Sequence, residues 1–206
     1  MNTDRTLYYV HDPMCSWCWG FAPTLDELLA ALPAELHLCR LLGGLAPDSD
    51  QPMPEETRQY VQRQWRNIQE RIPGTPFNFD FWTLCAPRRS TYPACRAVIA
   101  ARQQGEDLDA RMTRAIQQAY YLQARNPSDP DTLVALAAEL GLDTSDFATA
   151  LWSEAVQQQL LDEIRRSREL GAEGFPSLIL EEGGRRKSLR IDYVDHRSML
   201  DDLSLN

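Results

Sequence analysis

The sequence lacks a long apolar run and a surplus of basic residues. Nowhere do about 20 apolar residues follow one another, so no segment is predicted to span a bilayer. Acidic residues outnumber basic ones by 30 to 21, and the net charge of −9 argues against binding to nucleic acid or to an anionic lipid surface. The predicted partners therefore include neither nucleic acid nor a membrane.

Cysteine is scarce, and the number of cysteines is odd. Five cysteines fit poorly with a secreted framework of paired disulfides. No apolar segment of signal-peptide length precedes the first expected strand, since residues 1–6 read MNTDRT. These features predict a cytoplasmic protein, and in that compartment paired cysteines are usually catalytic or metal-binding.

Two of the cysteines, Cys15 and Cys18, lie two residues apart directly after an apolar β run. The stretch reads LYYVHDPMCSWCWGF over residues 7–21. Two thiols at this spacing can close a small disulfide or open to a dithiol, and a position in the first turn of a helix favours the thiolate that attacks disulfides. A strand, a CxxC pair and a helix in this order indicate a thioredoxin-like redox site.

Two other uses of the pair need residues that the sequence does not supply. A zinc site needs two further ligands at a recognisable spacing, and there is no second CxxC and no HxxxH. Haem attachment needs a histidine directly after the second cysteine, where Trp19 stands. No cofactor and no metal are therefore predicted.

Hydrophobic periodicity divides the chain into three parts. Residues 1–44 read as a strand, a helix and a second strand, which predicts a β-α-β unit with parallel strands. Residues 45–152 show helical patterns and no convincing strand, and their aromatic loop at 77–82 is expected to pack inside this part rather than bind a client. Residues 153–206 add a helix, two strands joined by a Gly-Gly turn, and a short helix.

Without the middle part, the element order is that of a thioredoxin fold. The sequence thus predicts an α/β protein in which residues 1–44 and 153–206 form a thioredoxin-like domain. Residues 45–152 are predicted to be a large, all-helical insertion into that domain.

Three features together resemble a known family. Residues 12–21 (DPMCSWCWGF), a helical insertion and residues 174–178 (GFPSL) resemble the DsbA-like thioredoxin superfamily, most closely its cytosolic branch of predicted protein-disulfide isomerases and FrnE-like proteins. The resemblance covers essentially the whole chain. It implies that Cys15 attacks a substrate disulfide, that Cys18 resolves the mixed disulfide, and that Pro176 is a cis-proline facing the pair. The Phe175 backbone would then turn toward the sulfurs, free to pair with an extended substrate.

The residues between the cysteines differ from those of periplasmic DsbA. Ser16-Trp17 stands where periplasmic DsbA has Pro-His, so its strongly oxidising character is not expected here. The branch also neighbours the kappa-class glutathione transferases and hydroxychromene-carboxylate isomerases, which have a serine near the position of Cys15.

The presence of both cysteines favours a thiol–disulfide oxidoreductase of the reductase or isomerase type. Its expected substrates are protein or low-molecular-weight thiols and disulfides, with glutathione as a candidate. A glutathione-dependent isomerase or transferase is the alternative enzyme, and a non-catalytic binding module is the third hypothesis.

Four side chains near the pair are candidates for roles besides sulfur chemistry. Trp17 is expected to be exposed and to contact apolar client segments, whereas Trp19 and Phe21 are expected in the core. His11 could stabilise the thiolate or shuttle a proton at the substrate site, although a hydrogen-bonded structural histidine is the favoured prediction.

The remaining cysteines and an arginine-rich segment have weaker signals. Cys39 is expected to be an inert buried thiol in a strand. Cys85 and Cys95 are expected to be unpaired, with a second disulfide or relay pair as the alternative. The segment RRSTY at residues 88–92 could line the cleft and bind a substrate carboxylate, and a solvated loop is the competing interpretation.

Overall fold

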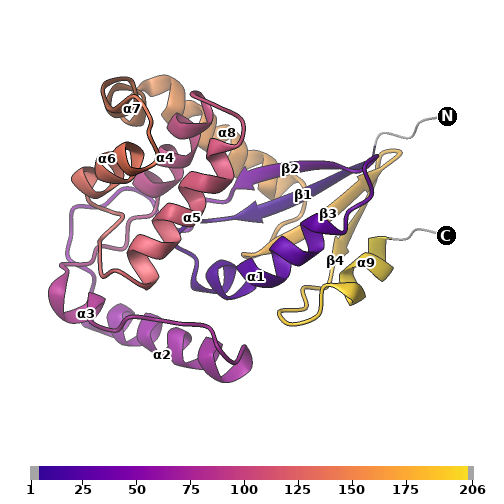
Figure 1. Ribbon diagram of the computed structural model, residues 1–206, viewed down its shortest axis with the longest axis horizontal. Helices are drawn as coiled ribbons and strands as arrows, with labels where there is room; N and C mark the ends of the chain where they lie inside the picture. The colour runs from indigo at the N-terminus through magenta and orange to yellow at the C-terminus, as the bar shows by residue number, and fades with distance from the viewer. Residues whose placement is uncertain (1–4, 204–206) are drawn as a thin grey trace.

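The computed structural model describes residues 5–203, which contain a four-stranded sheet (Figure 1). The strands are β1 (Arg5–His11), β2 (His37–Leu42), β3 (Ser177–Glu182) and β4 (Arg185–Leu189). They lie in the order β2-β1-β3-β4. Strand β2 is parallel to β1, which confirms the predicted β-α-β unit, and β3 is antiparallel to both β1 and β4.

Nine helices accompany the sheet within these residues. They are α1 (Ser16–Ala30), α2 (Glu55–Arg71), α3 (Phe81–Leu84), α4 (Tyr92–Arg102), α5 (Leu108–Tyr121), α6 (Pro130–Glu139), α7 (Thr144–Leu151), α8 (Glu154–Glu169) and α9 (Arg197–Leu203). In Figure 1, α2–α7 gather at the end of the sheet toward which β1 points. The short helix α3 lies in the stretch that the sequence predicts as an aromatic loop.

The ends of the helices follow from the residues found there. The Ser153 hydroxyl accepts a hydrogen bond from the Val156 amide at 3.2 Å and caps α8. Helix α6 has Pro130 in its first turn, where a missing amide proton costs little. Gly141 and Gly171, with φ of 78° and 90°, follow the ends of α6 and α8, because a left-handed residue satisfies the last helical carbonyls.

The two faces of β1 pack against different layers, since side chains alternate across a strand. Leu7 and Tyr9 belong to the cluster formed with α1 and α9, together with Phe21. Val10 belongs to a separate cluster that includes Leu170, just after α8. Not every apolar residue of α8 joins these clusters, since Leu161 is 40% exposed.

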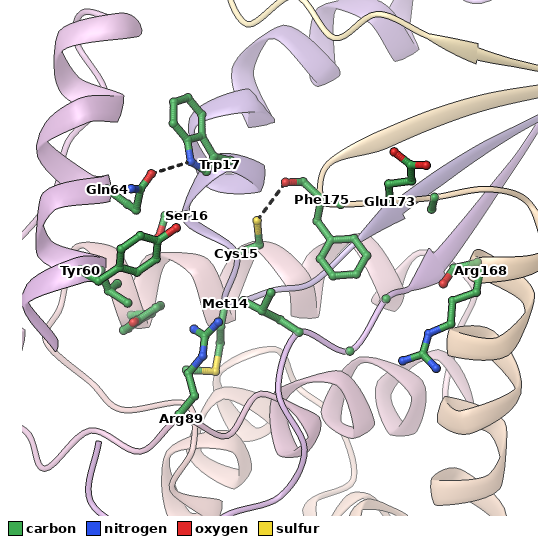
Figure 2. A pocket seen from close by; sticks show the side chains of 18 residues that line it. Met14, Cys15, Ser16, Trp17, Tyr60, Gln64, Arg89, Arg168, Glu173 and Phe175 are labelled. Carbon is green, nitrogen blue, oxygen red and sulfur yellow. Dashed lines mark hydrogen bonds between the residues drawn. The ribbon is translucent and has the colours of Figure 1, made fainter. Parts of the chain in front are cut away.

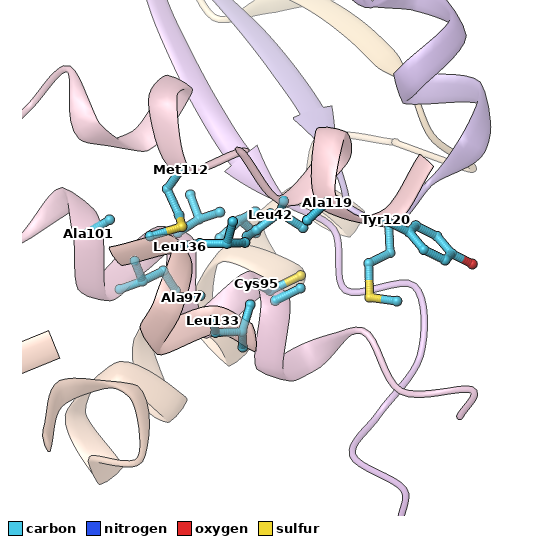
Figure 3. Packing of buried hydrophobic residues seen from close by; sticks show 14 of the residues in the cluster. Leu42, Cys95, Ala97, Ala101, Met112, Ala119, Tyr120, Leu133 and Leu136 are labelled. Carbon is cyan, nitrogen blue, oxygen red and sulfur yellow. The ribbon is translucent and has the colours of Figure 1, made fainter. Parts of the chain in front are cut away.

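The largest apolar cluster joins the helical part to the end of the sheet. Figure 3 shows Leu42 from β2 beside Met112 and Leu136 from α5 and α6. Trp19 of the cysteine motif belongs to the same cluster, and its 8% exposure confirms the predicted core position. The sheet and the helices thus share a continuous core. The division of the chain into a thioredoxin-like domain (1–44 and 153–206) and a helical insertion (45–152) stays a prediction.

An aromatic cluster surrounds Trp65 of α2, directly beneath the cysteine motif. The Trp65 ring contacts the rings of Phe77, Phe79, Phe81, Trp82, Tyr120 and Tyr121. The Trp65 indole N–H also donates to the Ser16 hydroxyl at 3.0 Å. The aromatic segment at 77–82 therefore packs inside the helical part, as predicted, and supports the start of α1.

Strand β4 forms one edge of the sheet, and three of its five residues are basic. Arg185, Arg186 and Lys187 are all exposed. Ion pairs tie two of them back to the chain, Arg186 to Glu181 and Lys187 to Asp202. None of the helices between residues 5 and 203 has the length and apolar character that a bilayer crossing requires.

A largely buried ion cluster joins the helices to β2. The Arg102 guanidinium of α4 contacts the Glu163 carboxylate of α8 at 2.6 Å and the Asp109 carboxylate of α5 at 2.5 Å. The other Glu163 oxygen accepts the Leu42 amide of β2 at 2.9 Å. Removing the arginine would leave two buried carboxylates without their counter-charge.

Arg102→Ala is therefore expected to lower the free energy of unfolding by about 3 kcal/mol or more. Arg111→Ala serves as the matched control, because its pair with Asp107 is exposed and is expected to contribute less than about 1 kcal/mol. Urea unfolding followed by circular dichroism measures both changes. Equal losses in the two variants would contradict the assignment of Arg102 as the link between the layers.

Candidate active site

Cys15 lies at the junction between β1 and α1, where it is the N-cap residue of the helix. The Cys15 amide donates to the Asp12 carbonyl at 3.0 Å, and the Cys15 carbonyl accepts the first helical hydrogen bond from the Trp19 amide at 3.1 Å. The first turn of α1 contains no acidic residue. The positive end of the helix dipole therefore acts on the Cys15 sulfur without a competing carboxylate in that turn.

Cys18 lies one turn further along α1, behind Cys15. Cys18 is 0% exposed, whereas Cys15 is 6% exposed and lines a cleft. Both thiols are free. Burial raises the pKa of the Cys18 thiol well above its ordinary value, and the neighbouring Cys15 thiol raises it further. The two sulfurs are thus unequal, with the accessible one at the mouth of the helix.

The segment before β3 forms the opposite wall of the site. The Phe175–Pro176 peptide bond is cis, as the family resemblance implied. The Phe175 carbonyl accepts a hydrogen bond from the Cys15 thiol at 3.5 Å. The Phe175 ring packs on Gly43, where an added Cβ would lie 1.9 Å from a ring carbon. A side chain at position 43 would consequently push Phe175 out of place.

Figure 2 shows the cleft that opens at Cys15, with a volume of about 420 Å³. Its walls come from the cysteine motif, the loop after β2, α2, the loop before α4, the end of α8 and the segment before β3. The lining residues are Met14, Cys15, Ser16, Trp17, Gly43, Gly44, Leu45, Tyr60, Val61, Gln64, Arg89, Tyr120, Ser167, Arg168, Ala172, Glu173, Gly174 and Phe175. The site therefore assembles segments that are distant in sequence.

Three charged side chains line this cleft. Arg89 lies on one side of Cys15, and Arg168 and Glu173 lie on the other (Figure 2). Within residues 5–203, neither arginine has an ion-pair or hydrogen-bond partner for its guanidinium group, in contrast to Arg88, which pairs with Asp129. Two uncompensated guanidinium groups and one carboxylate are thus available to a ligand.

Trp17 is half-buried, not exposed as the sequence analysis expected. Its indole N–H donates to the Gln64 side chain of α2 at 3.3 Å. Its ring contacts the Tyr193 ring at 5.2 Å and the Arg71 guanidinium at 5.7 Å. These contacts hold Trp17 between α2 and the segment before α9, although part of the side chain still lines the cleft.

Asp12 is a buried carboxylate beside the cysteine motif. One oxygen accepts the Met14 amide at 2.8 Å. The other accepts the Leu45 amide at 2.7 Å, the Thr91 hydroxyl at 2.6 Å and the Cys95 thiol at 3.5 Å. Burial raises the Asp12 pKa, and these hydrogen bonds oppose the rise. Asp12 thereby joins the cysteine turn, the loop after β2 and the start of α4.

His11 does not reach the cleft. It is 1% exposed and faces the layer formed by α1 and α5, where it stacks on Tyr9 with a ring separation of 4.8 Å. Burial lowers the His11 pKa to about 4, so the ring is neutral at physiological pH. The predicted contact of His11 with substrate at the mouth of the site is not provided by this arrangement. Neither ring nitrogen has a hydrogen-bond partner in the described part of the chain, so His11 is also not the hydrogen-bonded histidine that was favoured.

The other three cysteines are free and lie outside the cleft lining. Cys39 is half-buried, which corrects the prediction of a fully buried thiol. The Cys85 thiol donates to the Ala124 carbonyl at 3.0 Å, and Cys95 donates to Asp12, so the two are unpaired with each other as expected. Among residues 5–203, no three His, Cys, Asp or Glu side chains are grouped so that they could hold a metal ion.

Comparison with known proteins identifies the family. Residues 6–197 match the DSBA-like thioredoxin domain. The chain belongs to this family. The match includes all four strands and the helices between them, in agreement with the fold predicted from the sequence.

Solved structures of similar proteins cover nearly the whole DSBA-like chain. A candidate protein disulfide isomerase from Nitrosomonas europaea is 29% identical, with a TM-score of 0.83 and coverage of 97% of this chain and 96% of that one. The cytosolic disulfide reductase DsbM from Pseudomonas aeruginosa is 30% identical, with a TM-score of 0.78 and coverage of 96% and 98%. DsbM has also been solved with GSH, and that structure gives a TM-score of 0.77 at 28% identity and the same coverage.

Curated relatives of the DSBA-like chain are more distant. The ClpXP adapter protein SpxH from Halalkalibacterium halodurans is 24% identical over 206 residues. The match covers 96% of this chain and 67% of that protein. The chain therefore spans about two thirds of the length of this relative.

The DSBA-like cleft combines predicted residues with others that the sequence analysis missed. Cys15, Phe175 and Trp17 line it, Cys18 and Pro176 lie directly behind, and Arg89 comes from the predicted segment at 88–92. Arg168 and Glu173 were missed, and no local pattern distinguishes them from other surface charges. Asp12 was also missed, although a carboxylate within an apolar run is a recognisable signal of a buried, hydrogen-bonded group.

The unequal burial of the two cysteines predicts their order of alkylation. In the reduced protein at neutral pH, iodoacetamide should modify Cys15 at least about tenfold faster than Cys18, because the thiolate is the reactive form and must be accessible. Peptide mapping by mass spectrometry measures both rates. In Cys15→Ala, modification of Cys18 should require alkaline pH, since its thiolate forms only as the pH approaches the raised pKa. Equal rates at neutral pH would refute the assigned roles.

Proposed function

We propose that this protein is a thiol–disulfide oxidoreductase of the disulfide reductase type, with Cys15 as the nucleophile and Cys18 as the resolving thiol. The observation that carries the proposal is the Cys15 sulfur at the start of α1, where it lines the cleft, with the fully buried Cys18 thiol one turn behind it. The cis-Pro176 segment supports it, because the Phe175 carbonyl faces Cys15 and is available to an extended substrate.

The reaction uses two successive exchanges. The Cys15 thiolate attacks one sulfur of a substrate disulfide, the substrate S–S bond breaks, and the first thiolate leaves. Cys18, as a thiolate, then attacks the Cys15 sulfur and releases the second thiolate. The substrate gains two electrons, and the enzyme is left with a Cys15–Cys18 disulfide, which two molecules of a thiol reductant return to the dithiol.

Glutathione is the proposed small-thiol partner. At neutral pH it carries two carboxylates and one ammonium group beside its thiol, and the cleft offers Arg89, Arg168 and Glu173 around Cys15. The charges are complementary in sign and number. The GSH-bound structure of DsbM, a protein of the same fold at 28% identity, adds support.

The cytoplasm is the proposed compartment, because a reductase needs a reducing thiol pool. The cytosolic reductase DsbM, among the similar structures, supports this assignment. Protein disulfides stay proposed substrates beside glutathione disulfides. If the protein were instead a glutathione-dependent transferase or isomerase, it would turn over an aromatic acceptor, and this turnover would persist without Cys18. The cysteine variants below separate that enzyme from a reductase.

Replacing the two cysteines should separate the two steps. Cys15→Ser is expected to abolish reduction of insulin disulfides with glutathione as the reductant. Cys18→Ala is expected to accumulate a Cys15–glutathione mixed disulfide, because the release step lacks its nucleophile, and intact-protein mass spectrometry detects the adduct. Cys85→Ser is the control and should keep full activity, since Cys85 lies outside the cleft lining. Turnover by Cys15→Ser would disprove the proposed function.

The two unpaired arginines should contribute to substrate affinity. Arg89→Ala and Arg168→Ala are each expected to raise KM for oxidised glutathione about two- to fivefold, the size expected for exposed ion pairs, with little change in kcat. Arg190→Ala is the control, because Arg190 is exposed and lies outside the cleft lining. High salt should reduce the difference between variants and wild type. An unchanged KM in the Arg89→Ala, Arg168→Ala double variant would rule out recognition of the carboxylates by these residues.

A further inference from the structure

The resolving step requires a buried thiol to lose its proton. Cys18 is 0% exposed, and its raised pKa keeps it protonated at neutral pH. The nearby Asp12 carboxylate is occupied by hydrogen bonds from Met14, Leu45, Thr91 and Cys95. The Cys18 proton therefore needs another acceptor, and the next candidate lies on the side of Cys18 that faces away from the cleft.

Tyr9 of β1 is the first group on that route. Its side chain is close enough to Cys18 for the cysteine to raise the Tyr9 pKa, and its ring lies flat on the His11 ring, with an interplanar angle of 1°. Burial raises the Tyr9 pKa well above its ordinary value, and the nearby cysteines raise it further, so the hydroxyl keeps its proton and can donate it while accepting another.

A small, partly open cavity lies next to Tyr9 and His11. It has a volume of about 60 Å³ and is lined in part by Arg40, Thr113 and Gln117. Both His11 nitrogens and the Thr113 hydroxyl are buried and lack a hydrogen-bond partner within residues 5–203. One water molecule needs about 10–15 Å³ of such space, so the cavity has room for water, and unsatisfied polar groups are there to bind it.

We propose that this cavity is an ordered-water site that carries the Cys18 proton to solvent through the Tyr9 hydroxyl, with His11 positioning the water. The proposal rests on the proposed reductase function. As the Cys18 sulfur attacks the Cys15 sulfur of the mixed disulfide, the Cys18 proton passes to the Tyr9 oxygen and the Tyr9 proton passes to the water. The bond from Cys15 to the substrate sulfur breaks, and the substrate leaves as a thiolate.

The charges around the cavity suit this role. Asp109 of α5 faces His11 and favours its protonation, whereas Arg40 of β2 and Arg102 of α4 oppose it, and burial keeps the ring neutral. A neutral imidazole offers one donor and one acceptor to water. Asp26 and Arg114 form an ion pair at 2.5 Å and also line the cavity. Both side chains are partly exposed, so this side of the cavity faces bulk solvent.

Tyr9→Phe tests the route, and Tyr8→Phe is the matched control, because the Tyr8 hydroxyl lies in the other layer and accepts a hydrogen bond from Arg166 at 3.3 Å. The probe is the aromatic disulfide 5,5′-dithiobis(2-nitrobenzoate), in a background with Cys39 and Cys85 replaced by serine. Attack by Cys15 releases one coloured thiolate, and attack by Cys18 releases a second. Stopped-flow absorbance separates the two phases.

Tyr9→Phe is expected to slow the second phase about a hundredfold or more, the usual size for a lost proton-transfer group, and to leave the first phase unchanged. Its solvent deuterium isotope effect should also differ from that of wild type, which a purely structural role would not cause. His11→Phe keeps a stacked ring but removes both nitrogens, and it should slow the second phase in the same way. If Tyr9→Phe fails to fold, His11→Phe provides the test.

A wild-type second phase in both Tyr9→Phe and His11→Phe would overturn the proton route while leaving the reductase function intact. Absence of a second release in the wild-type background would instead refute the proposed function itself. If both phases also slow in the Tyr8→Phe control, the cause would be a general disturbance of the sheet. That result would also overturn the proton route.

Discussion

A buried carboxylate, that of Asp12, joins three stretches of chain that are far apart in the sequence. Its oxygens hold the turn before Cys15, the loop after β2 and the start of α4. The same loop carries Gly43, on which the Phe175 ring rests. The cysteine motif and the walls of its cleft thus share a common anchor, and the charge that makes this anchor possible is stabilised by hydrogen bonds where water is excluded.

Burial and position on the helix distinguish the two chemically identical cysteine side chains. Cys15 caps the helix and faces the cleft, whereas Cys18 is enclosed by the first turn and by Tyr9. A sulfur that is enclosed reacts only with a partner already held beside it, and the mixed disulfide on Cys15 is such a partner. The asymmetry therefore favours a sequential exchange over independent reaction of the two thiols.

Local patterns in the sequence predicted the elements well, because strand alternation, helix caps and Gly-Gly turns depend on neighbouring residues. The position of Cys15 at the start of a helix is such a case. The charges at Arg168 and Glu173 could not be predicted, since their meeting with Cys15 depends on how α8 packs against the sheet. His11 is close to Cys15 along the chain but does not reach the cleft, because strand alternation places it with Leu7 and Tyr9 on the face under α1.

The basic character of β4 has a consequence for the behaviour of the protein in solution. An edge strand presents unpaired amide and carbonyl groups that can join the edge of another molecule's sheet. Arg185, Arg186 and Lys187 place three exposed, hydrated cationic side chains along this edge, two of them ion-paired within the chain. Two copies brought together at β4 would oppose each other electrostatically, so the strand that completes the sheet also discourages intermolecular β-pairing and aggregation.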